Sequence, residues 1–344
     1  MRIIHSDNLM LRRYGELKVS TGRRHFNGMI RNNWKVCEFS ERDIAKFEAP
    51  LNIKPLGSKK ANRRFIETCD NYKPDLIMIG HSDLLTNKTL KEIKRLLPQT
   101  KLIYRNLDPL WRKRNIEMIH HRTEVIDALF VTTSGDPLKQ FLKKGMTAAF
   151  IPNATDPGMD DQNNSEKHSF DRDLVFIGRG NKSDDRYKFL QAIDQSPSIV
   201  DQLKFESYGL YGNPGVYGHA FEKVIATSKM GLNLNRFEGW PLYSSDRIAQ
   251  LIGNGILTFL WDKGEMRRLL TDEHVVYFSD LEDLINKVIS FQSDDAMRRE
   301  TASKGRAFYH RHFSGQRVTR FMVETAFGMN YSEDYIWQDQ VFRK

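Results

Sequence analysis

Continuous apolar runs alternate with amphipathic segments along most of the chain. Runs such as KPDLIMIG at residues 73–80 and ALFV at 128–131 are followed by stretches with helical spacing, and Ser20 or Thr21 is placed to cap an early helix. Strands without a polar face belong to parallel sheets that helices cover on both sides. The pattern therefore predicts an α/β protein of doubly wound architecture.

Two such alternating sets are present, and a polar stretch without period separates them. Residues 157–172, PGMDDQNNSEKHSFDR, are typical of a linker. We therefore expect an N-terminal Rossmann-like domain at 1–156 and a C-terminal one at 173–326. The aromatic tail, 327–344, is expected to pack back toward the N-terminal domain.

The stretch from 233 to 259, NLNRFEGWPLYSSDRIAQLIGNGILTF, combines a strand end, a polar loop, a helix and a glycine turn. The start of a helix presents unpaired N–H groups and a partial positive charge, which suit a phosphate. Ser244, Ser245 and Asp246 stand at that start. The same residue types also cap helices without binding any ligand, so both interpretations stay open.

Composition narrows the class of protein. The chain has 344 residues, 40% apolar and 28% charged, which is typical of a folded protein with two domains. No apolar run reaches the roughly 18 residues of a membrane span, and the start MRIIHSDN lacks the apolar core of a secretion signal. Cys37 and Cys69 are far apart, which favours reduced thiols and a cytoplasmic protein.

Charge is distributed unevenly along the chain. The net charge is +9; residues 1–150 hold 29 Lys and Arg against 16 Asp and Glu, whereas the remainder holds 24 against 28. A basic first half fits an anionic membrane surface, an anionic acceptor or, less well, nucleic acid. A solvated basic face without a partner explains the same numbers.

Open parallel sheets bind ligands beyond the carboxyl ends of their strands. The polar residues at the predicted strand ends are His5, His81, Ser82, Asp83 and 105–108 in the first half, and Gly178, Arg179, Tyr208, Gly209 and 235–246 in the second. If the two domains face one another across a cleft, a ligand bound by one domain could react with a ligand bound by the other. Either set alone would serve a binding protein.

Across about 300 residues the order of these features resembles the GT-B glycosyltransferases, and within them the CgeB-like (spore-maturation-protein-like) group related to the family-4 enzymes. The matching segments are GMIRNNWKVCEFSERDI, KPDLIMIGHSDLLTNKTLKEIK, YRNLDPLW, FIPNATD, DLVFIGRGNKSDDRYKFL, GLNLNRFEGWPLYSSDRIAQLIGNGILTF, DLINKVISF and ASKGRAFYHRHFS. The resemblance implies two Rossmann-like domains, the second binding a nucleotide-sugar donor and the first binding the acceptor.

The resemblance also implies roles for single residues of the second domain. Arg179 and Arg186 match positions where basic residues face the diphosphate of the donor, and the segment from Asp246 and Arg247 to Gly255 resembles one that ends in A-x-G. Alignment on Gly255 places Gln250 where a ribose-binding glutamate is usual. Alignment on Glu238 instead gives Glu238-x7-Asp246, an alternative pair of acids. The full expected donor set is Gly178, Arg179, Arg186, Tyr208, Glu238, Tyr243, Ser244, Ser245, Asp246 and Arg247.

Transfer of a sugar leaves negative charge on the departing diphosphate. Arg179, Lys182, Arg186 and Arg247 are the cations available to stabilise it, unless they are merely surface or capping charges. The adjacent pair Asp184–Asp185 lacks the spacing of a metal-binding DxD, so we expect no metal ion and no cofactor; the nucleotide sugar is a substrate.

The acceptor hydroxyl needs a general base in one class of mechanism. Asp108, His81 and Asp83 follow strands of the first domain and are the candidates, although each residue type also serves ordinary turns and ends of strands. Arg42 and Asp43 are expected to form a structural pair nearby.

These observations predict a metal-independent glycosyltransferase that transfers a sugar to a cell-surface glycan or glycolipid precursor. We expect it in the cytoplasm, held peripherally at the inner membrane by its basic N-terminal domain. Two alternatives stay open: a glycosyltransferase that acts on DNA or protein, and a non-catalytic two-lobed protein that binds nucleotide or nucleic acid.

Overall fold

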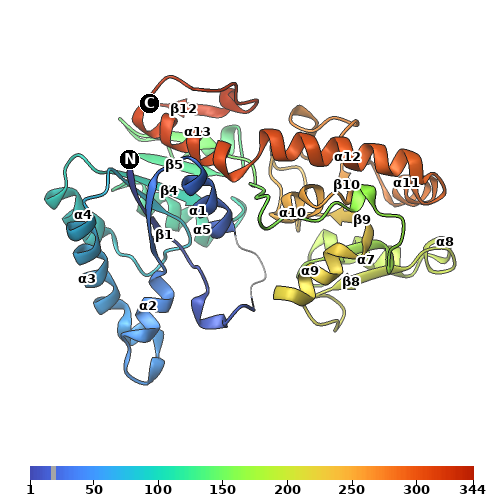
Figure 1. Ribbon diagram of the computed structural model, residues 1–344, viewed down its shortest axis with the longest axis horizontal. Coiled ribbons are helices and arrows are strands. Elements are labelled where there is room, and N and C mark those ends of the chain that lie inside the picture. Colours follow the sequence, from blue (N-terminus) through green and yellow to red (C-terminus); the bar gives the residue numbers. More distant parts are fainter. Residues whose placement is uncertain (17–20) are drawn as a thin grey trace. The chain divides into compact units, whose positions relative to one another are not determined.

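The computed structural model describes residues 1–16 and 21–344, which divide into two compact units. Unit 1 takes Met1–Gly15, 21–152 and Gly315–Lys344, and unit 2 is built from Asn153–Ser314. Each unit holds one predominantly parallel sheet with helices packed on it (Figure 1). The predicted α/β class with two doubly wound domains is confirmed.

Unit 1 has a seven-stranded sheet in the order β12-β6-β5-β4-β3-β1-β2. Its strands are β1 (Arg2–Ser6), β2 (Lys35–Phe39), β3 (Leu76–Ile79), β4 (Lys101–Asn106), β5 (Ala128–Val131), β6 (Thr147–Phe150) and β12 (Val341–Arg343). Its helices are α1 (Thr21–Arg31), α2 (Glu41–Phe47), α3 (Lys54–Tyr72), α4 (Asn87–Leu96), α5 (Lys113–Arg122), α6 (Asp136–Lys139) and α13 (Gly315–Phe327). Every residue of β3 and β5 is buried, as their apolar runs require.

Unit 2 has a five-stranded parallel sheet in the order β11-β10-β9-β7-β8. Its strands are β7 (Arg172–Ile177), β8 (Phe205–Tyr208), β9 (Ser228–Asn233), β10 (Leu257–Trp261) and β11 (Val276–Phe278). Its helices are α7 (Asp185–Asp194), α8 (Pro197–Val200), α9 (Gly218–Ala226), α10 (Arg247–Gly253), α11 (Leu281–Ser293) and α12 (Asp295–His312). Phe176, Leu232 and Phe259 are fully buried members of its larger apolar core.

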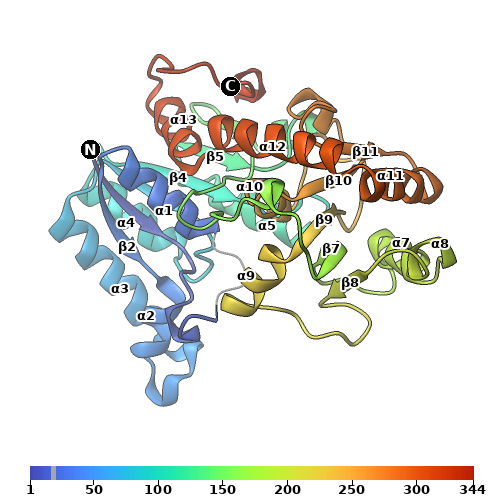
Figure 2. The same cartoon turned by 45° about the vertical axis from the view of Figure 1, so that its right-hand side comes forward.

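The last helix of the chain joins unit 1, whereas the sequence placed residues up to 326 in the second domain. α13 packs on α1, and the two helices appear side by side in Figures 1 and 2. They cross at Gly28 and Gly315, where a Cβ on either glycine would overlap backbone of the other helix. After α13 the chain stays in unit 1, where β12 pairs antiparallel with β6.

Residues 157–172 belong to unit 2 and are not a free linker. Their polar side chains bind backbone of the unit: Asn164 is fully buried, and its amide donates to the carbonyls of Ile225 and Ser228 at 2.7 and 2.8 Å. Polar composition was therefore misleading, because the polar groups are consumed inside the fold. Ser20, one of the two residues predicted to cap α1, lies outside the described residues.

Candidate active site

Two buried arginines lie where the strands of unit 2 end. Arg247 opens α10 and Arg186 lies in the first turn of α7, and their guanidinium groups stand 4.4 and 5.4 Å from the ring centre of Phe176. Nη1 of each donates to the carbonyl oxygen of Leu234, at 3.0 Å from Arg247 and 3.2 Å from Arg186. One carbonyl at the end of β9 thus gathers two positive charges from different helices.

Neither buried arginine has a carboxylate as its direct partner among the described residues. Within the described part of the chain, no carboxylate lies within ion-pair distance of Arg186 or Arg247, and Nε of Arg186 is buried without a hydrogen-bond partner. Burial, and then the charge of Arg236, lower the pKa of Arg186 to about 10. Burial, and then the charge of Arg186, hold the pKa of Arg247 well below its ordinary value. Buried like charges are costly until an anion joins them.

Gly178 makes room for Arg247 at the carboxyl end of β7. A Cβ on Gly178 would come within 2.5 Å of Nη2 of Arg247, the guanidinium nitrogen for which no bond is found among the described residues. Nε of Arg247 is held by the carbonyl of Ile177 at 2.6 Å, one residue earlier. The arginine therefore points one nitrogen at the glycine turn; that Gly178 and Arg247 bind the donor stays a prediction.

Ser244 and Ser245 of the Ser-Ser-Asp corner form hydrogen bonds to the carboxyl end of β9, and no described side chain caps α10. Ser244 is buried and accepts from the amide of Asn233 at 2.9 Å; Ser245 donates to Oδ1 of Asn233 at 3.0 Å and accepts from Arg247 at 3.1 Å. Asp246 occupies the N-cap position of α10 but makes no side-chain cap bond; it accepts from Gln250 at 3.2 Å. α10 spans only seven residues, so the arginines, not a helix dipole, carry the charge of this site.

Of the other predicted donor residues, Tyr243 influences the arginine pair, since it acts to raise the pKa of both. Glu238 also acts on both arginines, but its carboxylate is bound to the backbone N–H and the amide of Asn235, at 2.6 and 2.9 Å. Burial raises the pKa of Glu238, which weakens it as a counter-charge. Its position supports a structural role in the loop.

The side chains of Arg179 and Tyr208 bind other residues of unit 2 rather than the arginine pair. The guanidinium of Arg179 is exposed and donates to the hydroxyl of Tyr217 at 2.6 Å. Tyr208 turns back along the sheet, where its hydroxyl accepts from Arg172 at 3.0 Å and donates to Glu206. The side chain of Tyr208 is thus occupied away from the strand end, while its carbonyl accepts the N–H of Gly178 at 3.0 Å.

In unit 1, His81 and Asp108 are neighbours beyond the ends of β3 and β4. Nδ1 of His81 and Oδ2 of Asp108 lie 4.0 Å apart, and both side chains are about two-fifths exposed. Asp83 is engaged by Arg42, whose Nε donates to it at 2.9 Å. Although burial raises the pKa of Asp83, this hydrogen bond and the charge of Arg42 hold it below the ordinary value. Asp108 also lies 3.8 Å from Nη1 of Arg112 through its other oxygen, so Oδ2 is the atom that faces His81.

The pairing of Arg42 corrects a sequence interpretation. Arg42 and Asp43 were expected to pair with one another, yet Arg42 binds Asp83 and Asp43 binds Arg12 at 3.0 Å. Asp43 also accepts the backbone N–H of Leu11 at 2.9 Å, so it fastens the loop after β1. Adjacent helix residues point apart, which explains why they find different partners.

A buried charged cluster behind His81 escaped the sequence reasoning. Asp7, which follows β1, accepts from the guanidinium of Arg105 and from the backbone N–H of His81, the latter at 3.2 Å. Although burial acts to raise it, Arg105 and His5 hold the pKa of Asp7 well below its ordinary value. Gly80 leaves room for this pair, because a Cβ there would overlap both partners. The signal that could have identified it is His-x-Asp at the end of a buried strand.

Glu41, at the start of α2, is a second buried acid that the sequence did not single out. It is fully buried, and burial followed by the charge of Asp83 raises its pKa to about 8. One oxygen accepts the N–H of Leu84 at 2.9 Å, while the other has no hydrogen bond within the described residues.

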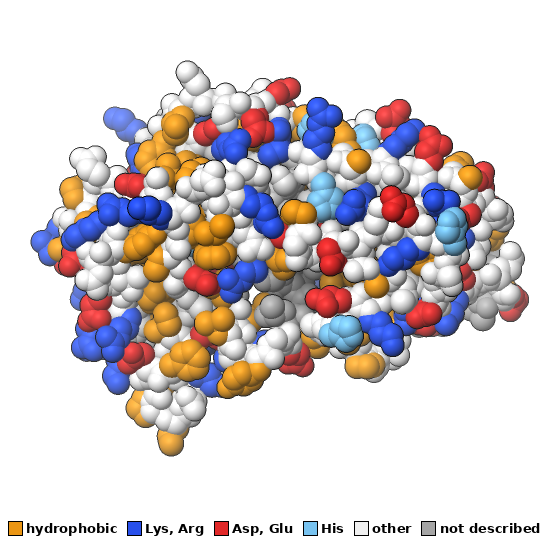
Figure 3. All heavy atoms as spheres, in the orientation of Figure 1, with side chains coloured by type: hydrophobic (Ala, Val, Ile, Leu, Met, Phe, Trp, Pro, Cys, Tyr) orange, Lys and Arg blue, Asp and Glu red, His pale blue; other side chains and the backbone are white. Residues whose placement is uncertain are grey.

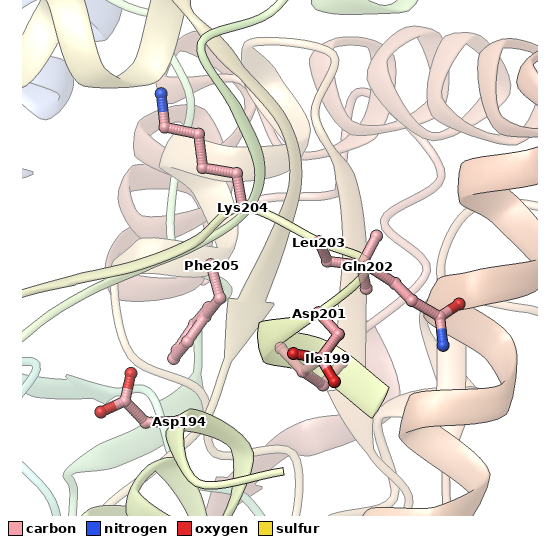
Figure 4. A pocket seen from close by; sticks show the side chains of 7 residues that line it. All are labelled: Asp194, Ile199, Asp201, Gln202, Leu203, Lys204 and Phe205. Atoms are coloured by element: carbon pink, nitrogen blue, oxygen red, sulfur yellow. The ribbon is translucent and has the colours of Figure 1, made fainter. Parts of the chain in front are cut away.

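A hollow of about 600 Å³ in unit 2 lies at the amino end of β8, away from the strand ends where the arginine pair lies. It is lined by Asp194, Ile199, Asp201, Gln202, Leu203, Lys204 and Phe205 (Figure 4). These residues precede or begin β8, whereas the arginine pair follows the carboxyl ends of β7 and β9. In the described ranges, 1–16 and 21–344, no group of three or more His, Cys, Asp or Glu residues is placed to hold a metal ion. Metal independence stays a prediction.

A family model described as glycosyl transferase-like matches residues 186–324. The match includes both buried arginines and the Ser-Ser-Asp corner, so the predicted glycosyltransferase is confirmed at the level of this domain. The CgeB-like subgroup stays a prediction. No curated protein matches the chain in sequence.

Solved structures with low sequence identity share the fold over nearly the whole chain. HepE of Anabaena, in complex with UDP-glucose, gives a TM-score of 0.62 at 13% identity and covers 96% of this chain and 100% of its own. Sucrose-phosphate synthase of Thermosynechococcus elongatus gives 0.59 at 12%, covering 95% and 98%. The DNA-modifying enzyme β-glucosyltransferase gives 0.57 at 12%, covering 96% and 100%. The GT-B type of fold is therefore established.

Proposed function

We propose that the protein is a glycosyltransferase that moves a sugar from a nucleoside diphosphate sugar to a cell-surface glycan or glycolipid precursor, without a metal ion. The observation that carries the proposal is the pair Arg186 and Arg247, which are buried together at the strand ends of a glycosyl transferase-like domain with no carboxylate of the described residues within ion-pair distance. HepE holds UDP-glucose, so a uridine diphosphate sugar is the first donor to test.

The arginine pair would stabilise the leaving group. When the anomeric C–O bond breaks, negative charge develops on the departing diphosphate. Nη2 of Arg247 at the Gly178 turn and Nε of Arg186 are donors not used by the fold, so they would bind this charge. The carbonyl of Leu234 and the ring of Phe176 hold both groups in place beforehand, which lowers the cost of organising them during the reaction.

On the acceptor side, His81 and Asp108 form the proposed base. An imidazole beside a carboxylate takes a proton from a hydroxyl while the carboxylate stabilises the imidazolium that results. Asp7 fixes the backbone of His81 through its N–H, and Arg105 fixes Asp7. We place the protein on the cytoplasmic side of the inner membrane, where glycolipid precursors are presented.

Thermal shift with a panel of nucleotides tests the donor half of this proposal. UDP, GDP, ADP, dTDP and CMP, each alone and as a sugar conjugate, are added to the protein; a ligand at a hundred times its Kd adds about 2.7 kcal/mol to the free energy of unfolding. We expect one nucleoside diphosphate to raise the melting temperature. Arg247→Gln should abolish the rise, while Arg298→Gln, a buried arginine on the carbonyls of Asn164 and Lys167, should retain it. A panel without any shift would refute the donor site.

A second acceptor class has support of its own. The DNA-modifying enzyme β-glucosyltransferase shares the fold, and residues 1–150 carry a large positive excess. Transfer of radiolabelled sugar to a lipid-linked glycan, to duplex DNA and to protein, measured side by side, decides among these acceptors. Nucleotide binding with neither transfer nor donor hydrolysis would instead indicate a non-catalytic binding protein.

A further inference from the structure

The connection between α2 and α3 exposes large apolar side chains that the fold does not use. Phe47, Leu51, Ile53 and Leu56 are 63%, 88%, 46% and 58% exposed, all within ten residues. Figure 1 shows this connection extending beyond the ends of the two helices, and Figure 3 shows hydrophobic side chains at its tip. Isolated exposed apolar residues are ordinary, but four in one short segment mark a contact surface.

The backbone conformation of the connection holds these side chains in solvent. Leu51 and Asn52 adopt left-handed conformations, with φ of 55° and 57°. A leucine is disfavoured there, and this one gains no burial in return. The base of the connection is fixed, because Gly57 at the start of α3 packs so closely on α2 that a Cβ would overlap the carbonyl oxygen of Ala45. The apolar tip is therefore held out from unit 1 on a packed base.

Basic residues flank the tip along the chain. Residues 46–64 include six basic side chains against one acidic, Glu48, which pairs with Arg64 at 2.9 Å. Glu67, one turn further along α3, pairs with Arg63 and Arg64, and within the described residues it leaves the four lysines of the segment as its unneutralised charges. The basic residues are Lys46, Lys54, Lys59, Lys60, Arg63 and Arg64. Lys59 and Lys60 lie on the exposed face of α3, one turn after Leu56. An apolar tip within a cationic rim matches the boundary of an anionic bilayer, where acyl chains lie beneath negative headgroups.

We propose that residues 46–64, the α2–α3 tip, dock on a bilayer rich in anionic phospholipid. The apolar side chains enter the interface between headgroups and acyl chains, and the lysines contact the headgroup phosphates. A convex tip of this kind fits a deformable lipid surface, while its charge selects an anionic one. No helix in the described ranges is long and apolar enough to cross a membrane. The proposal locates the membrane contact of the proposed function, but lipid binding itself requires neither donor nor acceptor.

Vesicle co-sedimentation of the full chain tests the proposal. The probes are vesicles of pure phosphatidylcholine and vesicles with one-third phosphatidylglycerol. We expect binding to the anionic vesicles only, weakening as salt is raised. Leu51→Ser should lower the partition coefficient by about tenfold, and the double variant Lys59→Glu, Lys60→Glu by tenfold or more. Their nucleotide-induced thermal shifts should equal that of the wild type.

Matched controls come from the same unit. Leu96→Ser removes another exposed leucine, and Lys143→Glu with Lys144→Glu reverses another adjacent pair of exposed lysines; neither should lower binding by more than twofold. Absence of binding to anionic vesicles would overturn the proposal, as would equal losses in tip and control variants. A dimer in solution that Leu51→Ser dissociates, without lipid binding, would assign the tip to a second copy of the chain and also overturn it.

Discussion

Replacing Arg186 by Met should stabilise the free protein. A pKa lowered from 12.5 to about 10 corresponds to a cost of about 3 kcal/mol for holding the charge in the folded state. Because the folded pKa lies below the unfolded one and the protonated form is the charged form, the cost applies at every pH below about 10. Loss of the bond to the carbonyl of Leu234 costs about 1 kcal/mol, and that carbonyl keeps its bond from Arg247. The net gain is about 2 kcal/mol.

The assay is a melting curve with and without nucleotide. For a unit of this size, 2 kcal/mol raises the melting temperature by about 4–8 °C. Arg186→Met should show this increase without ligand and should lose the increase that a nucleoside diphosphate gives the wild type. A higher melting temperature without ligand, together with a lost nucleotide shift, would show that the charge of Arg186 serves ligand binding and not the stability of the fold.

Arg298→Met is the matched control. Arg298 is also buried in unit 2, but it has a carboxylate partner, Asp295, at 2.7 Å and donates to two backbone carbonyls. Its removal should destabilise the protein and leave the ligand effect intact. If Arg186→Met lowers the melting temperature as Arg298→Met does, the guanidinium of Arg186 stabilises the fold and is not a charge kept for a ligand.

Four further predictions concern single positions. Gly178→Ala should displace the guanidinium of Arg247 and weaken nucleotide binding at least tenfold in calorimetry, whereas Gly264→Ala, with room for its methyl group, should not. Asp108→Asn should lower kcat by about 10² or more while leaving the nucleotide-induced thermal shift unchanged. The pKa of Glu41 is raised to about 8, so its protonated form stabilises the fold; this contribution is complete below pH 4.5 and is lost as the pH rises through 8. Between pH 5 and 9, the unfolding free energy of Glu41→Gln in denaturant titrations should therefore fall by a few kcal/mol less than that of the wild type. Gly28→Ala should separate α1 from α13 and lower the unfolding free energy by about 1–3 kcal/mol; an unchanged melting temperature would contradict the close crossing.

The sheets were predictable from the sequence because their signal is local. Runs such as 128–131 are apolar at every position, and only a strand buried on both faces needs that pattern. The division into units was not predictable in detail. It depends on Gly28 meeting Gly315 and on Asn164 binding carbonyls of unit 2, contacts between residues distant in sequence that composition does not reveal.

The candidate site divides in the same way. Arg186, Arg247 and Gly178 could be named because strand ends and helix starts follow from the alternation of elements. The sequence could not predict that both arginines donate to the carbonyl oxygen of Leu234, because any residue type can supply a backbone acceptor. Tyr208 shows the opposite error: it stands at a strand end in sequence, yet its side chain turns back toward Arg172.

A crystal structure of the protein with UDP bound would test the central claim most directly. The account predicts the diphosphate at the Gly178 turn, with phosphate oxygens in hydrogen-bond contact with Nη2 of Arg247 and Nε of Arg186. Density for the nucleotide at any other place, with both arginines still bound only to backbone and side-chain oxygens of the protein, would contradict it.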